Sequence, residues 1–372
     1  MTISKINAAL ATVSDPELHK PLTELGMVES VAFESGTATL GILLTISGCP
    51  MRDRLTADIT KAVTAIAEVN AVVINFGVMS EAQRGEVKKL LRGGREKFIP
   101  FAQPDSLTRV FGIASGKGGV GKSSVTVNLA VAVANRGFKV GILDADVYGH
   151  SVPRLMGLAG QRPTAIDQTF IPLEAHGVKV VSMEMFKPDR SDPIAYRGPL
   201  LHRVLEQLLS DAYWGDLDFL FLDLPPGTGD IAISLGQLIP ASEILVVTTP
   251  QVAAAEVAER AGRIAHQLKQ HLVGVVENMS EFPCPNCDEM ISLFGKDGGE
   301  ETAARLSGLV GADVPLLAKI PFDPNLREGG DTGTPLVLRN PESNAAKALE
   351  AIADQLTLRT KSLVGVRLGL ST

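Results

Sequence analysis

The sequence predicts an α/β protein with a mostly parallel β-sheet flanked by helices, preceded by a small α+β domain. From Leu107 onward, short and strongly apolar segments alternate with helical patterns, which is typical of a parallel sheet covered on both faces. Before Arg92 the pattern differs, because two strand patterns follow each other across a short turn. With 372 residues, the chain is also longer than one typical domain.

The predicted domain boundaries follow from these patterns. Residues 1–92 form the small α+β domain, residues 93–106 form a linker rich in glycine and proline, and residues 107–372 form the larger α/β domain. In the first domain we expect a helix carrying Ile3, Ile6, Leu10 and Val13, strands at 28–33 and 37–45 joined at residues 34–36, a helix at 51–68 and a strand at 71–76.

The buried strands of the larger domain are expected at residues 110–114, 139–143, 219–224, 244–248, 272–276 and 316–320. In parallel sheets of this kind, nucleotides bind at the carboxyl ends of the strands. The residues that directly follow these strands are therefore the first candidates for a functional site.

One such segment, residues 116–123, reads G-K-G-G-V-G-K-S and fits the phosphate-binding pattern G-x-x-x-x-G-K-[ST]. Its glycines allow backbone N–H groups to surround a phosphate, and the following helix adds a favourable dipole. Lys122 can reach the terminal phosphates, and the Ser123 hydroxyl can ligate magnesium. A glycine-rich surface turn is the alternative, but the strand before and the helix after the segment favour a P-loop NTPase fold that binds ATP and Mg²⁺. The predicted nucleotide-binding residues here are Gly116, Lys117, Gly118, Gly119, Val120, Gly121, Lys122, Ser123 and Ser124.

The loop contains a second lysine, Lys117, directly after its first glycine. In this feature the chain resembles the deviant Walker A ATPases, which include the partitioning and division-site ATPases, the nitrogenase iron protein and the Mrp/ApbC iron–sulfur carriers. The resemblance implies a homodimer that encloses two ATP molecules, with Lys117 acting catalytically on the phosphates of the facing subunit. A solvated loop lysine is the alternative.

Three acidic residues follow predicted strands of the same domain. Asp144 and Asp146 come after residues 139–143, and Asp223 ends the apolar run 219–222. The family resemblance implies that Asp146 positions the attacking water, that Asp223 belongs to the magnesium shell, and that residues 227–230 form a switch loop. For any one of these acids, a helix cap is the alternative interpretation.

Two further residues are candidates for the adenine side of the site. Asn278 follows the strand pattern at 272–276, and Pro321 follows the one at 316–320. In the resembled family, residues at these points lie against the adenine. Asn and Pro after strands are also ordinary turn residues.

Cys284 and Cys287 stand in the sequence F-P-C-P-N-C, which closely matches the C-P-x-C segment of the Mrp/ApbC carriers. The spacing directs two thiolates toward one metal, whereas an iron–sulfur cluster typically takes four protein ligands. A two-fold dimer supplies the missing pair, so the resemblance implies a 4Fe–4S cluster shared by two subunits. A bridging zinc site needs the same four sulfurs, and a thioredoxin-type redox pair shares the spacing.

The third cysteine, Cys49, is followed by Pro50, a residue suited to the first position of a helix. Cys49 is then expected at the helix N-cap, where the helix dipole stabilises a thiolate. With the segment Asp15–Leu18, the first domain resembles the small iron–sulfur assembly domains of the PaaD and SufT kind. A buried structural cysteine is the alternative.

The composition limits the partners. A net charge of −7 and a sequence pI near 5.5 argue against binding to nucleic acid or to an anionic membrane. No apolar run is long enough to span a bilayer and the first residues lack a signal-peptide core, so a cytoplasmic protein is expected.

The function that these features predict is that of an Mrp/ApbC-type carrier, a dimeric ATPase that passes a 4Fe–4S cluster from donors to apo-proteins. The alternative is a MinD/ParA-like positioning ATPase with a zinc-clasped dimer. Membrane-bound relatives of that kind use a basic amphipathic C-terminal helix, and residues 362–370 lack this pattern. An electron-transfer ATPase like the nitrogenase iron protein is a third possibility, but that family does not use this cysteine pair.

Overall fold

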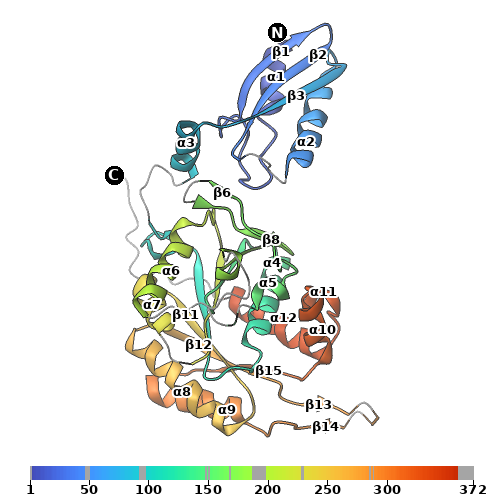
Figure 1. Cartoon of the computed structure of the whole chain (residues 1–372). Coiled ribbons are helices and arrows are strands. Elements are labelled where there is room, and N and C mark those ends of the chain that lie inside the picture. Colours follow the sequence, from blue (N-terminus) through green and yellow to red (C-terminus); the bar gives the residue numbers. More distant parts are fainter. Residues whose placement is uncertain are drawn as a thin grey trace, which may run out of the picture. The chain divides into compact units, whose positions relative to one another are not determined.

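The computed structural model describes residues 2–46, 51–91, 98–146, 149, 151–166, 169–186, 198–227, 230–284, 286–287 and 289–358. The chain divides into two units (Figure 1), one made of Met1–Phe98 with Thr164–Ile171 and the other of Ile99–Pro163 with Pro172–Thr372. Thr164–Ile171, which the sequence pattern had placed in the larger domain, groups with the first unit. There the Thr164 hydroxyl donates a hydrogen bond of 2.7 Å to Glu17.

The first unit is an α+β unit built around a three-stranded sheet in the order β1-β2-β3. Strands β1 and β2 are antiparallel, whereas β2 and β3 are parallel. Ser35 and Gly36 between β1 and β2 both have positive φ, at 48° and 81°, as a tight two-residue hairpin turn requires. The elements are α1 Thr2–Leu10, β1 Val28–Glu34, β2 Thr37–Leu44, α2 Arg52–Thr64, β3 Ala71–Val78 and α3 Glu81–Leu91.

Helix α2 begins later and ends earlier than the sequence pattern predicts. Its N-cap residue is Met51, whose carbonyl accepts the N–H of Leu55 at 2.9 Å, and its last residue is Thr64. The prediction that Pro50 opens this helix with Cys49 as N-cap was therefore wrong. Cys49 itself lies outside the described residues.

The second unit contains an eight-stranded sheet in the order β15-β12-β11-β4-β10-β5-β9-β8. All neighbouring strands are parallel except β8, which is antiparallel to β9. The strands are β4 Arg109–Ser115, β5 Val140–Asp144, β8 Leu173–Ala175, β9 Val178–Ser182, β10 Phe219–Asp223, β11 Glu243–Thr248, β12 His271–Asn278 and β15 Leu316–Ile320. The predicted mostly parallel sheet is confirmed.

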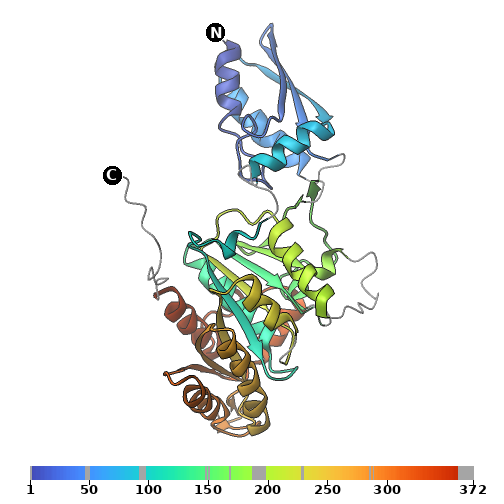
Figure 2. The same ribbon diagram turned by 90° about the vertical axis from the view of Figure 1, so that its left-hand side faces the viewer.

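Helices cover both faces of this sheet, as Figures 1 and 2 show. Helices α4 and α12 pack on one face, and α7, α8 and α9 pack on the other. The helices of this unit are α4 Lys122–Asn135, α5 Val152–Leu155, α6 Gly198–Asp211, α7 Asp230–Leu238, α8 Val252–Gln267, α9 Gly298–Val310, α10 Pro324–Thr332, α11 Leu336–Arg339 and α12 Asn344–Leu358. Every residue of β4, β5 and β10 is buried, which explains their continuous apolar sequences.

Short elements complete the chain. Two-residue strands form two small antiparallel hairpins, β6 with β7 and β13 with β14. Their bounds are β6 Ala165–Ile166, β7 Thr169–Phe170, β13 Phe282–Pro283 and β14 Met290–Ile291, and 3₁₀ turns lie at Pro100–Ala102 and Met183–Phe186.

Arg109 on β4, which is buried, and Glu243 on β11, which is partly buried, form an ion pair. The guanidinium donates to both carboxylate oxygens, with Nε–Oε1 at 2.9 Å and Nη2–Oε2 at 3.0 Å. Burial raises the pKa of Glu243, but hydrogen bonds from His271 and Arg109 outweigh burial, so this pKa lies below its ordinary value of 4.5. The pair therefore stabilises the fold above that pH, and its contribution is lost as the pH falls through the lowered pKa.

We expect Glu243→Gln to lower the free energy of unfolding near neutral pH by about 3 kcal/mol, because the buried Arg109 loses its carboxylate. The single tryptophan of the chain, Trp214, is buried and reports this unfolding by fluorescence. The difference from wild type is expected to shrink as the pH falls below 4.5 and through the lowered pKa of Glu243, where the folded wild-type carboxylate becomes protonated. Glu342→Gln, at an 84% exposed side chain, is the control and should change little. A difference that does not vary with pH would contradict the pairing.

Candidate functional site

The phosphate loop lies between the carboxyl end of β4 and the first turn of α4. Gly119 and Gly121 have φ of 82° and 79°, a conformation that favours glycine. A Cβ atom at Gly121 would lie 2.3 Å from Nδ2 of Asn278, so no side chain fits there. At Gly119 no atom beyond its chain neighbours lies within 4 Å of a Cβ position, so it is the positive φ that favours glycine there.

Three polar side chains of α4 contact Asp223, which lies at the end of β10. Lys122 Nζ lies 2.7 Å from its Oδ1, and the Ser123 hydroxyl donates to its Oδ2 at 2.5 Å. A third partner, Thr126, donates its hydroxyl to Oδ1 at 2.8 Å. Sequence reasoning missed Thr126, although it stands one helical turn after Ser123. The structure thus brings Lys122, Ser123 and Asp223 together as the sequence pattern requires.

Asp144 and Asp146 occupy different environments at the end of β5. Burial and the negative charge of Asp223 raise the pKa of Asp144 well above its ordinary range. Asp144 is completely buried, and the Ser182 hydroxyl lies 3.2 Å from its Oδ2. Asp146 lies nearer the surface and accepts the N–H of Gly149 at 3.0 Å. Of the two, Asp146 is the less deeply buried.

Lys117 is held within its own chain. Its ammonium donates a hydrogen bond to Oε1 of Gln251, the residue that directly precedes α8. Sequence reasoning did not select Gln251, which stands 134 residues away in the chain. In the described structure Lys117 therefore has an intramolecular partner.

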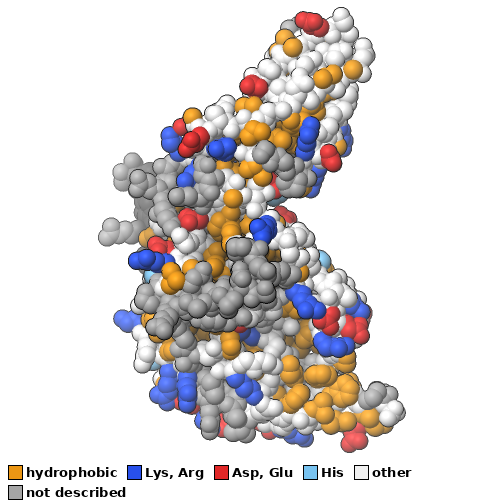
Figure 3. Space-filling model, viewed as in Figure 1, with side chains coloured by type: hydrophobic (Ala, Val, Ile, Leu, Met, Phe, Trp, Pro, Cys, Tyr) orange, Lys and Arg blue, Asp and Glu red, His pale blue; other side chains and the backbone are white. Residues whose placement is uncertain are grey.

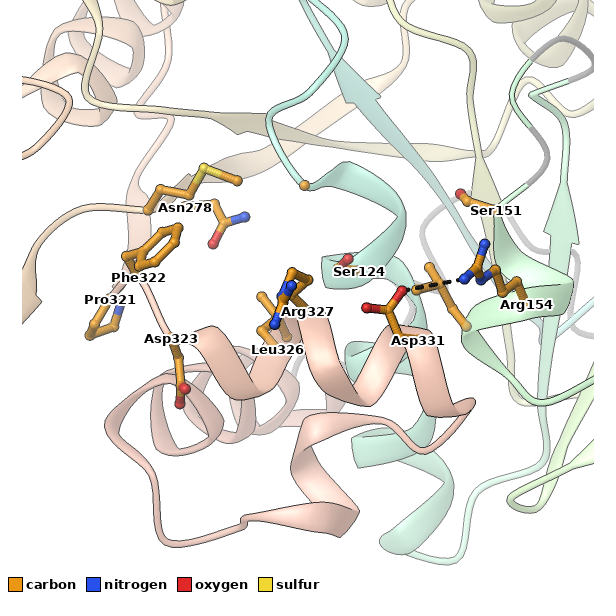
Figure 4. A pocket seen from close by; sticks show the side chains of 14 residues that line it. Ser124, Ser151, Arg154, Asn278, Pro321, Phe322, Asp323, Leu326, Arg327 and Asp331 are labelled. Carbon is orange, nitrogen blue, oxygen red and sulfur yellow. Dashed lines mark hydrogen bonds and ion pairs between the residues drawn. The ribbon is translucent and has the colours of Figure 1, made fainter.

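An open pocket of about 470 Å³ lies beside the loop (Figure 4). Ser124, Asn278 and Pro321 all line it, together with Phe322 and Arg327. Asn278 donates its Nδ2 to the carbonyl of Val120 at 2.9 Å, which fixes the orientation of the amide. Its buried Oδ1 has no hydrogen-bond partner within the described part of the chain. A buried acceptor of this kind suits an amino group of a bound base.

The donor set also fits a magnesium ion at the phosphate side. Ser123 supplies a hydroxyl oxygen and Asp223 supplies carboxylate oxygens, and these hard oxygen ligands are the ones Mg²⁺ takes in proteins. The switch-loop candidates are only partly visible. Gly227 donates its N–H to the Ser115 carbonyl at 2.9 Å, whereas Thr228 and Gly229 lie outside the described residues.

Cys284 and Cys287 lie in the hairpin formed by β13 and β14. The N–H of Cys284 donates to the carbonyl of Glu289 at 2.9 Å, which closes the loop. The N–H of Asn286 lowers the pKa of Cys284 most, and the thiol and N–H of Cys287 lower it further. Both thiols are free, and Cys287 is exposed. Cys287 is therefore accessible, and Cys284 forms a thiolate more readily than an ordinary cysteine.

The described residues of one chain do not complete a metal site at this hairpin. Over the described ranges, no group of three or more His, Cys, Asp or Glu side chains is placed to hold a metal ion. The hairpin also carries an apolar surface: Met290, Ile291 and Leu293 are 46%, 41% and 52% exposed. Figure 3 shows hydrophobic side chains gathered at this end of the molecule. Exposed apolar side chains that gather in one patch are typical of a protein interaction site.

In the first unit, the segment that contains Asp15 and Glu17 is a second candidate for a functional region. Asp15 is buried, and its Oδ1 accepts the N–H groups of Glu17 and Leu18 at 2.9 and 2.8 Å. These bonds account for Asp15 as a turn-forming residue. Burial raises the pKa of Glu17, the hydrogen bond from Thr164 lowers it, and the charge of Asp15 raises it further, so that the pKa lies above its ordinary value.

The phosphate loop, the buried acid at β10 and the nucleotide-sized pocket define the second unit as a P-loop NTPase. A family described as NUBPL iron-transfer P-loop NTPase (ParA) matches residues 106–357. A second family, described as iron–sulfur cluster assembly protein, matches residues 3–75. The chain belongs to the NUBPL iron-transfer P-loop NTPase family and carries an N-terminal iron–sulfur cluster assembly domain. The family predicted from the phosphate loop and the cysteine pair is confirmed.

Relatives share this arrangement over nearly their whole length. An iron–sulfur cluster carrier protein of Mycobacterium tuberculosis is 56% identical over 367 residues, covering 98% of this chain and 96% of its own. One from Synechocystis is 40% identical, covering 96% and 97%. A nucleotide-binding protein of Archaeoglobus fulgidus, solved in complex with ADP, is 34% identical with a TM-score of 0.54, covering 66% of this chain and 96% of its own. No helix within the described ranges is long and apolar enough to cross a membrane.

Proposed function

We propose that this protein is a magnesium-dependent ATPase that, as a homodimer, carries a 4Fe–4S cluster and transfers it to apo-proteins. The observation that carries the proposal is the pair of free thiols, Cys284 and Cys287, in the same unit as the phosphate loop and its neighbouring pocket. The relatives named as iron–sulfur cluster carrier proteins support it.

The nucleotide half of the proposal assigns each residue a physical role. Lys122 neutralises the β- and γ-phosphates, and Asp146 orients the attacking water. Ser123 and Asp223 hold magnesium, which when bound offsets the charge that develops on the transferred phosphoryl group. Asn278 and Pro321 contact the base. The phosphate-binding backbone is supplied by Gly116, Lys117, Gly118, Gly119, Val120, Gly121, Lys122, Ser123 and Ser124.

The cluster half of the proposal concerns cargo. Each subunit presents two thiolates, so two subunits related by a two-fold axis present the four that a cluster takes. The apolar residues Met290, Ile291 and Leu293 then lie in the contact between subunits or between carrier and acceptor. A cluster held at such an exposed hairpin can be passed to another protein more easily than a buried one.

The test is reconstitution of the full chain with iron and sulfide under anaerobic conditions, followed by incubation with an apo-protein acceptor. We expect bound iron and sulfide, the visible absorbance of a cluster, and activation of the acceptor. A protein that takes one zinc ion per dimer, refuses iron and activates no acceptor would instead be a positioning ATPase with a zinc-clasped dimer.

Lys117 provides a test of the dimer. If it acts on the facing subunit, Lys117→Ala should lower kcat by about a thousandfold, as loss of a trans-acting cation does, while ATP affinity changes little. Mixing Lys117→Ala subunits with Asp146→Asn subunits should then restore activity, because each heterodimer has one intact site. Lys347→Ala, an exposed lysine on α12, is the control. Heterodimers that are shown to form but stay inactive would place Lys117 in its own subunit's site.

A further inference from the structure

One aromatic residue, Phe322, both lines the nucleotide pocket and contacts the cysteine hairpin. It follows β15 and lines the pocket with its neighbour Pro321 (Figure 4). Its ring meets the ring of Phe282 edge-on, with centroids 5.6 Å apart and planes at 77°. Phe282 belongs to β13 and stands two residues before Cys284. A single contact between side chains thus separates the pocket wall from the strand that carries the cysteines.

The other leg of the hairpin reaches the same ring. Phe294, three residues after β14, has its ring centroid 6.5 Å from that of Phe322. Phe322 is therefore flanked by one aromatic ring from each leg. Edge-to-face and tilted aromatic pairs prefer defined geometries, so a movement of the central ring changes the preferred positions of its neighbours.

Backbone hydrogen bonds tie the same segments together. The N–H of Phe322 donates to the carbonyl of Glu281 at 2.7 Å, and the N–H of Ser280 donates to Ile320 at 3.0 Å. Asn278, which lines the pocket, lies only four residues before Phe282. The first leg of the hairpin is thus a direct continuation of the pocket wall.

The chain after the hairpin is anchored to the phosphate side. A Cβ at Gly298 would lie 2.5 Å from the carbonyl oxygen of Pro250, so this backbone packs directly against the residue before Gln251. Gln251 in turn accepts the hydrogen bond from Lys117. The first leg of the hairpin and the start of α9, which follows the hairpin, therefore both lie against elements of the nucleotide site.

We propose that Phe322 is a positioning residue that couples nucleotide binding to the order of the cysteine hairpin. A base in the pocket packs on Phe322, restricts its ring, and through Phe282 and Phe294 holds the two legs together. If bound nucleotide changes the affinity of the cysteines for their ligand by some factor, that ligand changes the affinity for nucleotide by the same factor, because coupling between two sites is reciprocal. The identity of the two ligands rests on the proposed function. The coupling itself makes the nucleotide pocket a regulator of the cysteine hairpin in the same chain.

Hydrogen exchange of the metal-free full-length protein tests the coupling. The N–H of Cys284, bonded to Glu289, reports closure of the hairpin. We expect saturating ADP to slow exchange in the peptide from Glu281 to Phe294 by about fivefold or more. In Phe282→Leu, which leaves the pocket lining unchanged, ADP should bind as in wild type but exchange should no longer respond. Phe282→Tyr, which keeps the ring, should retain the response, and so should the control Met290→Leu.

Two results would overturn the proposal: an exchange rate in wild type that ignores bound ADP, or a full response in Phe282→Leu. ADP binding is measured separately by calorimetry, so a missing response is not confused with an empty pocket. Because no iron takes part, failure of the protein to carry a cluster leaves this result unaffected. The two hypotheses can therefore fail independently.

Discussion

Lys122→Ala is expected to abolish ATP hydrolysis and to weaken ATP binding. Lys122 is the first residue of α4, and its Nζ lies 2.7 Å from Asp223 at the phosphate side of the site. Removing one preorganised group that stabilises developing charge lowers kcat by about a thousandfold. Phosphate release with Mg²⁺ and ATP measures this, and Lys347→Ala serves as the exposed control. Wild-type turnover in a folded Lys122→Ala protein would refute the site.

The same substitution has a structural consequence. Asp223 is completely buried, and in Lys122→Ala its carboxylate keeps only the hydroxyls of Ser123 and Thr126 as partners from α4. An uncompensated buried charge costs about 3 kcal/mol or more, so the variant should unfold more readily. The double variant Lys122→Ala with Asp223→Asn removes that charge. It should recover stability without recovering hydrolysis, which separates the catalytic effect from the structural one.

The sequence predicted the parts of the molecule that depend on local pattern. Strands such as β4 and β10 were found because they are buried on both faces and therefore carry continuous apolar runs. Strands β8 and β9 were not among the predicted strands, and in β8 no residue is fully buried. The phosphate loop was found because its backbone conformation favours glycine at particular positions, as the positive φ of Gly119 and Gly121 shows. Asp223 could be selected because it ends an apolar strand pattern, and in a parallel sheet the carboxyl ends of the strands lie at the same edge as the phosphate loop.

The sequence did not predict contacts between distant segments. Gln251 as the partner of Lys117 depends on how α8 starts beside β4, and no periodicity encodes that. Strands β13 and β14 have two residues each, which is too few to show an alternating pattern. The contact between Phe282 and Phe322 joins segments that lie far apart in the sequence. Helix α2 was misjudged because Pro50 is compatible with a helix start but does not require one.

Cys284→Ala and Cys287→Ala are each expected to remove the cluster completely. A cluster held by four thiolates at a two-fold axis loses two ligands when one position is changed, because both subunits carry the substitution. Visible absorbance and iron should disappear together, and activation of an apo-protein should stop. ATP binding should persist, since neither cysteine is among the residues that line the nucleotide pocket. Cys49→Ala is the matched control and should keep this cluster.

The number of irons and their dependence on subunit composition decide whether the cluster is shared. The wild type should hold about four irons per dimer at this hairpin, not per monomer. When wild-type and Cys284→Ala subunits are co-expressed at varied ratios, a shared cluster requires two wild-type subunits. Its content should then fall as the square of the wild-type fraction. A cluster completed within one chain would fall in simple proportion, and that outcome would contradict the two-subunit site while leaving the carrier function open. Since one chain presents only two thiolates at this hairpin, Cys284 and Cys287, we expect the square dependence.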